Sequence, residues 1–580
     1  MVQLRSVGDG PPEERMKMDG IRFKQPTAPR NQLVLFAQSL DEVLGPDAPA
    51  RGLWRLLEDV DWTPWERAYE GCGQPPYPPR HLAAAILYGL LHKARSSRDL
   101  EDAARHRLDF IWLLEGFTPD HSTFAEFRLR HADAIRDLQK QLARALVAKR
   151  EAEVLQLLLD GTRLRADSDW HGSRTAETIE RIIGELEQRM AELARGDGEA
   201  SPEEPPQDAA ELEKLLGQLE QQRAKYQHAL ETARARDARA QRHDGKNARP
   251  VRVPITDPDA HVLPNKEGGF APNYTPIAAV EPQTGAIVHS DVLEGSDEAS
   301  AVLPAVEAAE QLTGHKANAV LADGNFAAGE ILEALEDRGT AAYMPTTAAS
   351  PPDNPAVRPD PSQPVAEADR GRLPKHGKHF ARTAFIYDTH ADIYYCPMGN
   401  TLTPYKHGGN KDGVPCTYYR AHACPGCPLA RDCVKGKDPC RTLVRDRYEP
   451  LREATAQRMA TPEGRAIYKA RAPGIEGVFA QIKAILGIRR FTLRGLEKVR
   501  LEWSWICAAY NLKKLLAIEA QSAQKTDPNT TQRPFFSPPG PLTRSTAAHG
   551  IFLVQKNQHP ILPAIRPIGR SPCTKTKIAV

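Results

Sequence analysis

Apolar residues recur at helical spacing over the first quarter of the chain. From about residue 31 to residue 150 they return every three or four positions, which is the period of a helix that buries one face. Ser96 and Ser97 precede one such segment, and residues 119–123 open another, as helix-capping residues do. The pattern predicts compact helices joined by short turns, and it suits both a helix-turn-helix DNA-binding region and a plain helical bundle.

The pattern then changes to one that is typical of alternating strands and helices. A mostly apolar run ends at Asp160 and another ends at Asp323, so each predicts a buried strand that stops on a carboxylate. Residues 273–295 predict a strand pair, followed by a helix capped by Ser296 and Asp297. A further helix and strand follow. Strands interleaved with helices predict an α/β layer with a mixed sheet.

Two segments interrupt this α/β layer. One is rich in Glu, Gln, Lys, Arg, Leu and Ala and predicts a hairpin of two long helices, and the other holds six of the nine cysteines. Helices resume near Thr461, a capping residue followed by proline. The predicted organisation is a disordered N-terminus at 1–30, a helical domain at 31–150, an α/β core at 151–345 and 460–518, a helical hairpin insertion at 173–245, a Cys-rich insertion at 346–459 and a disordered tail at 519–580.

Charge and composition narrow the class of protein. The net charge is only +2, yet residues 465–514 carry eleven Lys or Arg side chains against three carboxylates, and residues 80–150 carry thirteen against nine. Basic segments of this kind favour a nucleic-acid partner, although a solvated helix face gives the same pattern. No apolar run is long enough for a membrane helix, and the first twenty residues lack the apolar stretch of a signal peptide. We therefore expect a soluble cytoplasmic protein without a membrane partner.

The strand-end carboxylates are the first candidates for chemistry. Asp160 and Asp323 are each followed by glycine, and Asp-Gly is a common turn dipeptide, which is the simpler interpretation of either one alone. Two of them in one α/β layer suggest a site for a hard divalent cation such as Mg²⁺. Glu476 offers a third carboxylate, because Pro473 predicts a helix start that places Glu476 in the first turn and Lys483 two turns later on the same face. A solvent-exposed charge pair is the alternative for the last two.

These motifs, in this order, resemble the DDE-type transposases of bacterial insertion sequences. The resemblance covers roughly residues 30–515 and rests on PPYPPRHLAAAILYGLL, SSRDLEDAARHRLDFIWLLEG, PDHSTFAEFR, LLLDGT, LADGNF and YKARAPGIEGVFAQIK. It implies an RNase H-like catalytic core, an N-terminal helix-turn-helix-like DNA-binding region, and two divalent metal ions per site, Mg²⁺ or Mn²⁺ in its place. Asp160, Asp323 and Glu476 match the catalytic, metal-binding carboxylates of that family.

The resemblance also extends to basic and aromatic side chains near the glutamate. Tyr468, Arg471 and Lys483 match residues that surround it in related enzymes, and the resemblance implies that they contact DNA. The chain departs from the family pattern at two points: four residues separate Arg471 from Glu476 where three are usual, and Asn325 stands where an aromatic residue is more usual. Basic side chains of the following segment are expected to contact DNA phosphates, and they are Arg489, Arg490, Arg494 and Lys498. Trp503 and Trp505 in the same segment are expected in the core.

The function implied by the resemblance is binding of the terminal inverted repeats of a transposon, followed by metal-dependent cleavage and transfer of the freed 3′-hydroxyl to target DNA. Such a protein would act on double-stranded DNA as a homodimer in the nucleoid. The chain contains no Walker-type glycine loop, which agrees with a reaction that hydrolyses no nucleotide. Two alternatives stay open: a catalytically inactive, transposase-derived DNA-binding protein, and a metal-dependent nuclease that does not join DNA.

The clustered cysteines suggest a second metal. Cys424 and Cys427 form a C-x₂-C pair, Cys433 follows closely, and Cys396 in a Cys-Pro-x-Gly turn could complete a tetrahedral zinc site. Reduced buried thiols are the alternative interpretation. The remaining cysteines comprise two possible substitutes, Cys416 and Cys440, and three without an assignment, Cys72, Cys507 and Cys573.

Overall fold

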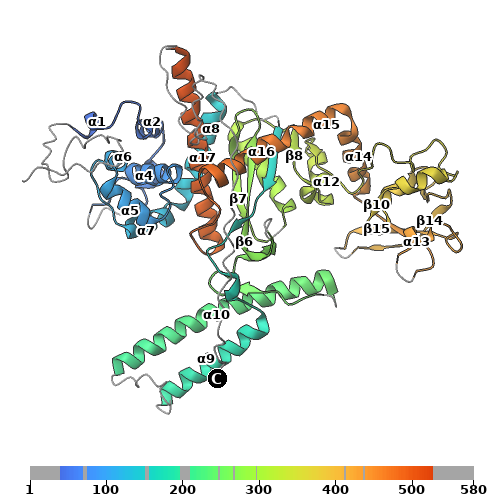
Figure 1. Cartoon of the computed structure of the whole chain (residues 1–580), viewed down its shortest axis with the longest axis horizontal. Helices are drawn as coiled ribbons and strands as arrows, with labels where there is room; N and C mark the ends of the chain where they lie inside the picture. The colour runs from blue at the N-terminus through green and yellow to red at the C-terminus, as the bar shows by residue number, and fades with distance from the viewer. Residues whose placement is uncertain are drawn as a thin grey trace, which may run out of the picture. The chain divides into compact units, whose positions relative to one another are not determined.

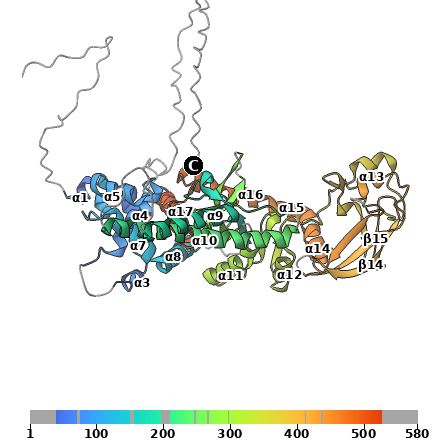
Figure 2. The same cartoon turned by 90° about the horizontal axis from the view of Figure 1, so that it is seen from below.

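The computed structural model describes most of the chain between residues 39 and 526 (Figures 1 and 2). The described ranges are 39–69, 75–149, 156–195, 209–245, 248–264, 268–295, 297–410, 413–435 and 438–526. The predicted disorder at 1–30 lies outside these ranges, as do Cys72, Cys573 and most of the predicted tail. Residues 519–526 belong instead to the last described helix, α17 (Leu496–Thr526).

Short helices make up the described N-terminal region, which ends where the first strand begins. They are α1 (Leu40–Val43), α2 (Pro49–Leu56), α3 (Thr63–Glu66), α4 (Pro79–Leu91), α5 (Ser97–His106), α6 (Leu108–Leu113), α7 (His121–Arg130) and α8 (Ala132–Lys149). Two predicted helix starts are confirmed: Ser96 forms a capping box with Asp99, and Asp120 accepts a hydrogen bond from the backbone N–H of Thr123.

One hydrophobic core joins these helices to the rest of the protein. Helix α17 packs against α4, α8 and the sheet, so that the C-terminal helix lies within the N-terminal region. Trp65, only 1% exposed, stacks on Phe127 and meets Trp505 edge to face. Trp503 and Trp505 are both buried, as the sequence predicted.

The sheet at the centre of this core is mixed. Its main strands are β1 (Gln156–Gly161), β6 (Phe270–Glu281), β7 (Ala286–Leu293), β8 (Ala319–Leu321) and β9 (Ala341–Tyr343), in the spatial order β7-β6-β1-β8-β9. Strand β6 is antiparallel to its neighbours β7 and β1, whereas β1, β8 and β9 are parallel to one another. Two short strands, β2 (Leu164–Arg165) and β5 (His261–Pro264), pair with the first half of β6. Because β1 and β8 are parallel, their C-terminal ends lie at the same edge.

Helices from both sides of the Cys-rich segment pack on this sheet. Helix α11 (Val302–Thr313) contacts β7 and β1, and α12 (Gly329–Asp337) contacts β9. Helix α16 (Arg471–Ala480) lies directly on β1, since a Cβ at Gly474 would collide with Leu158. Ser296, one of the two residues predicted to cap α11, lies outside the described ranges. The other, Asp297, is not the cap: the helix is entered through a 3₁₀ turn, η3 (Ala299–Ala301), which Glu298 precedes without a side-chain cap bond.

A helical hairpin extends between the first and second main strands. Helices α9 (Ala176–Arg195) and α10 (Ala209–Asp244) pack against each other and form the green pair in Figure 1. Ile179 and Ile183 of α9 share a small apolar cluster with Ala229 and Ala233 of α10. At the base of the hairpin, β3 (Ser173–Arg174) pairs with β4 (Val253–Pro254).

The Cys-rich segment has its own apolar cluster and an antiparallel five-stranded sheet. The strands are β12 (Ile386–Asp388), β13 (Ile393–Tyr395), β14 (Thr401–Gly409), β15 (Pro415–Ala421) and β16 (Thr442–Asp446), accompanied by β10 (Lys375–His376), β11 (His379–Phe380) and α13 (Ala430–Cys433). The following helix, α14 (Glu449–Ala460), packs on α12 and β9. The chain therefore rejoins the core before residue 460, where the sequence had placed the boundary. Thr461 caps the next helix, α15 (Pro462–Lys469), as predicted.

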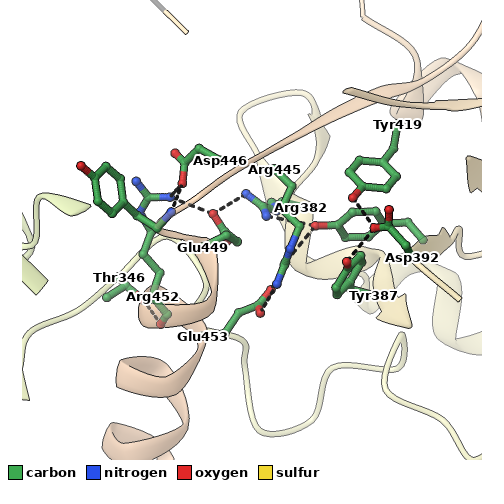
Figure 3. A network of polar contacts seen from close by, with 12 residues as sticks. Thr346, Arg382, Tyr387, Asp392, Tyr419, Arg445, Asp446, Glu449, Arg452 and Glu453 are labelled. Carbon is green, nitrogen blue, oxygen red and sulfur yellow. Dashed lines mark hydrogen bonds and ion pairs between the residues drawn. The ribbon is translucent and has the colours of Figure 1, made fainter. Parts of the chain in front are cut away.

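Ion pairs link the five-stranded sheet to α14, as Figure 3 shows. Arg445 of β16 binds both carboxylate oxygens of Glu453, at 2.6 and 2.8 Å. Glu449 is 1% exposed and is paired with Arg382 at 2.7 Å and with Arg452 at 2.9 Å. Such buried pairs depend on each partner, because either charge left alone would be strongly destabilising. None of the helices in the described ranges is long and apolar enough to span a membrane.

Candidate active site

Asp160 and Asp323 lie at the shared edge formed by the ends of β1 and β8. Asp160 is the second-last residue of β1, and Asp323 lies two residues after the end of β8. In the pairing of the two strands, Leu158 stands opposite Leu321. Asp323 is also the N-cap of a 3₁₀ turn, η4 (Gly324–Phe326), where it accepts a hydrogen bond from the backbone N–H of Asn325 at 2.9 Å. The turn interpretation of this Asp-Gly dipeptide is thus correct, and it does not compete with a role at the strand edge.

Glu476 reaches the same edge from α16. The prediction that it lies in the first helical turn is wrong, because α16 begins at Arg471 and Pro473 is its third residue. Proline is tolerated there since the first backbone N–H groups of a helix make no intrahelical bond. Burial raises the pKa of Asp160, and the charges of Asp323 and Glu476 raise it further. Asp323 and Glu476 therefore both lie near enough to Asp160 for their charges to act on it.

Arg471 is the main positive charge beside Asp160. Its guanidinium Nη2 lies 3.1 Å from Asp160 Oδ2, and the two side chains are 11% and 17% exposed. This ion pair offsets part of the rise that burial causes in the pKa of Asp160. Tyr468 is in the same group, since burial raises the pKa of its phenol and Arg471, Asp323 and Asp160 all act on it. The extra residue between Arg471 and Glu476 does not remove Arg471 from the site.

Lys483 lies beside the end of β1. Its Nζ donates hydrogen bonds to Thr162 Oγ1 at 2.5 Å and to the backbone oxygen of Arg163 at 3.1 Å. The residue is in η7 (Gln481–Ile485), a π-helical turn that continues α16. Such turns are frequent at functional sites. The ammonium group is therefore held by the residues that directly follow the end of β1.

The other predicted DNA contacts lie further along the same segment. Arg490 and Arg494 are about half exposed, and both pair with Asp167. Arg489 is exposed and its backbone oxygen accepts a hydrogen bond from the N–H of Arg165, while Lys498 is exposed in the first turn of α17. Arg490 and Arg494 thus gather at Asp167, and Lys498 lies at the start of α17.

The sequence did not single out Glu298, and it marked Asn325 only as a departure from the family pattern. Asn325 Nδ2 donates a hydrogen bond to Glu298 Oε2 at 3.1 Å. Burial raises the pKa of Glu298, and the Asn325 bond opposes that rise, whereas the nearby charges of Asp323 and Asp160 add to it. The sequence offered no separate signal for Glu298, which follows the predicted cap Ser296-Asp297 directly and was interpreted as the first residue of the helix.

The chemistry of the carboxylates fits a hard divalent cation. Asp160, Asp323 and Glu476 present oxygen ligands from a strand, a turn and a helix, and their like charges repel in a way that a cation would relieve. Within the described ranges, no three His, Cys, Asp or Glu side chains already stand in an arrangement that could hold a metal ion. The three carboxylates are therefore the type of ligand that a hard divalent cation binds. In this structure the positive charge next to Asp160 is that of Arg471.

Four cysteines of the Cys-rich segment line one cavity of about 20 Å³, next to Arg441. They are the four predicted zinc ligands, Cys396, Cys424, Cys427 and Cys433. Burial raises the pKa of the Cys433 thiol to about 12, and the other three sulfurs act on it. Cys424 Sγ accepts a hydrogen bond from the backbone N–H of Arg441 at 3.4 Å. Cys416 lies elsewhere, on β15, where its thiol donates to the backbone oxygen of Val414.

Fold and site together define a mixed α/β protein with acidic and basic side chains gathered at one edge of its sheet. Two family comparisons then match the chain: "Transposase DDE domain" over residues 395–516 and "Transposase domain (DUF772)" over residues 38–130. Together they indicate a DDE-type transposase of an insertion-sequence family, which confirms the resemblance drawn from the sequence. No curated protein and no solved structure gave a match. The first match includes Tyr468, Arg471, Glu476 and Lys483, whereas Asp160 and Asp323 lie outside both.

Proposed function

We propose that this chain is a transposase that binds transposon ends and catalyses metal-dependent DNA cleavage and strand transfer by a 3′-hydroxyl. The observation that carries the proposal is the geometry at one sheet edge: Asp160 and Asp323 stand at the ends of the adjacent parallel strands β1 and β8, and Arg471 of α16, the helix that carries Glu476, is paired with Asp160. A transposase family match around Glu476 supports the same function independently.

The proposal includes an RNase H-like catalytic core. If the five main strands are numbered by their order in the chain, they lie in the sheet in the order 3-2-1-4-5, which is β7-β6-β1-β8-β9. Only the second strand, β6, is antiparallel to the others. That order brings the ends of the first and fourth strands together, which is where such a core needs its two aspartates. The N-terminal helices α4 to α7, within the second family match, are the proposed DNA-binding region.

Each side chain at the edge has a role in this proposal. Asp160, Asp323 and Glu476 would hold divalent metal ions, Mg²⁺ or Mn²⁺. When bound, such ions supply the charge that activates an attacking oxygen and stabilises a leaving one at phosphorus. Arg471 holds the Asp160 carboxylate in place through their ion pair. Lys483, beside Thr162, would hold a phosphate of the DNA against this edge.

The basic segment after α16 would extend the DNA contact. Arg489 and Lys498 are exposed, and Arg490 and Arg494 are half exposed around Asp167. A phosphate would compete with Asp167 for the last two, so binding should weaken steeply as salt rises. The proposal also includes assembly as a homodimer on DNA, which light scattering with and without a transposon-end fragment would test.

A structural zinc ion in the Cys-rich segment is part of the proposal. Four cysteines line one cavity, and the Cys424–Cys427 loop turns at Gly426, whose φ of 75° glycine adopts without strain. The backbone N–H of Arg441 donates to Cys424 Sγ, a contact that stabilises a thiolate. Zinc would then fix a sheet that α14 anchors to the core.

The test uses DNA ends taken from the genomic flanks of the gene. Wild type and Asp323→Asn are compared for end binding, cleavage and joining with Mg²⁺ or Mn²⁺, with Asp297→Asn as the matched control on an exposed aspartate. The expected result is metal-dependent cleavage and joining in wild type and in the control, and their loss in Asp323→Asn with binding retained. Binding without cleavage by wild type would instead favour the inactive DNA-binding protein, and cleavage without joining would favour the nuclease.

A further inference from the structure

Glu298 lies between Gly161, which follows Asp160, and Asn325, the second residue after Asp323. Its Oε2 accepts the hydrogen bond from Asn325 Nδ2 at 3.1 Å. Its Oε1 lies 3.1 Å from the point where a Cβ on Gly161 would stand. Gly161 in turn donates its backbone N–H to Asp160 Oδ1 at 2.9 Å. The absence of a side chain at Gly161 thus leaves room for a carboxylate that reaches the site from the segment before α11.

Asn325 connects Glu298 to Asp323. Its backbone N–H donates to Asp323 Oδ1 at 2.9 Å while its side-chain amide donates to Glu298. An ionised carboxylate only accepts hydrogen bonds, so Glu298 fixes which end of the Asn325 amide faces it. The next residue of the same turn, Phe326, is fully buried and anchors the turn in the core. The orientation of Asp323 is therefore supported from the side of Asn325 and, through it, from Glu298.

We propose that Glu298 is a positioning residue for Asp323, acting through Asn325. The inference rests on the proposed function, in which Asp323 is a catalytic group. The Glu298 carboxylate is half buried near the like charges of Asp323 and Asp160. Such a placement costs free energy, which the hydrogen bond from Asn325 offsets. Glu298 makes no cap for α11, so the helix gives no separate reason for that placement.

Four variants separate the hydrogen bond from the charge. Glu298→Gln keeps an oxygen that can accept from Asn325, and Glu298→Ala removes it. Asn325→Asp sets two carboxylates against each other, whereas the double variant Glu298→Gln/Asn325→Asp restores a donor and an acceptor with their roles exchanged. Glu330→Ala, at an exposed position on α12, is the control for loss of a glutamate.

Cleavage rate at saturating end DNA, DNA affinity and thermal unfolding are measured for each variant across a range of Mn²⁺ concentrations. Glu298→Ala should cut about tenfold more slowly, in the range seen when a group that orients a metal ligand is lost. DNA affinity should stay unchanged, Glu298→Gln should stay within about threefold of wild type, and the double variant should recover most of the rate lost in Asn325→Asp.

Several results would overturn the inference while leaving the proposed function intact. These are a wild-type rate in Glu298→Ala, an equal loss in Glu298→Gln and Glu298→Ala, or a full recovery of Glu298→Ala at high Mn²⁺, which would make Glu298 a metal ligand instead. A double variant no faster than Asn325→Asp would do the same. If wild type itself cuts no DNA end under any of these conditions, the proposed function fails and the inference fails with it.

Discussion

The guanidinium of Arg471 lies 3.1 Å from the carboxylate of Asp160, so the start of α16 is tied to the end of β1 by an ion pair that is mostly buried. The pair brings the helix that carries Glu476 to the strand that carries Asp160. The pair also places Arg471 at the centre of the candidate site, although its spacing from Glu476 departs from the family pattern.

Removing this arginine should destabilise the protein as well as inactivate it. In Arg471→Ala the buried Asp160 carboxylate has lost its ion-pair partner, and the free energy of unfolding should fall by about 3 kcal/mol. Asp160→Asn in the same background removes the unpaired charge and should restore part of that loss. Urea unfolding of the two variants measures both effects; equal stability of single and double variants would show that the pair does not hold the two elements together.

The close contact between α16 and β1 gives a second prediction. A Cβ at Gly474 would collide with Leu158, so Gly474→Ala should push the helix away from the strand, costing about 1–3 kcal/mol and most of the cleavage activity. Leu158→Ala/Gly474→Ala makes room for the new methyl group and should cut DNA better than the single variant. A Gly474→Ala protein with wild-type cleavage would argue against the placement of α16.

Zinc content tests the cysteine ligands. The purified chain should contain about one zinc ion, since four cysteines suffice for a tetrahedral site. Cys427→Ala should lose the metal and lower the melting temperature. Cys416→Ala, which changes a cysteine outside the cavity, should retain it. Elemental analysis distinguishes the two, and retention of zinc in Cys427→Ala would exclude this ligand set.

A buried histidine predicts a dependence of stability on pH. His131 is 2% exposed among Trp65 and Phe127, and burial, together with the charge of Arg130, lowers its pKa to about 4. Its folded-state pKa is below the unfolded value of about 6.5, so its contribution is fully present above pH 6.5 and is lost as pH falls toward 4.

The variant His131→Phe isolates this contribution. Its free energy of unfolding should decline less steeply than that of wild type between pH 6.5 and pH 4, even if it is less stable at pH 7. His106→Gln, which changes an exposed histidine, serves as the control. Parallel pH profiles for wild type and His131→Phe would contradict the assignment.

The strand-end aspartates could be found from the sequence because their signal is local. An apolar run that stops on a carboxylate identifies a buried strand end, and parallel neighbouring strands bring such ends together. The helix of Glu476 was also found, although its start was placed too late, since proline is accepted anywhere in the first turn.

Glu298 had no such signal. Its role depends on the missing side chain of Gly161 and on a bond from Asn325, both distant in sequence, and acidic residues before a helix are equally typical of caps. The early return to the core at α14 was missed for a related reason: Glu449 and Arg452 look like surface charges until Arg382 and Asp446 pair with them.

The most direct test of the account is joining of a pre-cut transposon end, bearing a free 3′-hydroxyl, to target DNA. Wild type, Glu476→Gln and the exposed control Glu463→Gln are compared with Mn²⁺. Joining by wild type and by the control, with none by Glu476→Gln despite normal end binding, is the result that the three-carboxylate site predicts. Joining that survives in Glu476→Gln would contradict it, because the carboxylate that α16 brings to β1 would then have no part in the transfer.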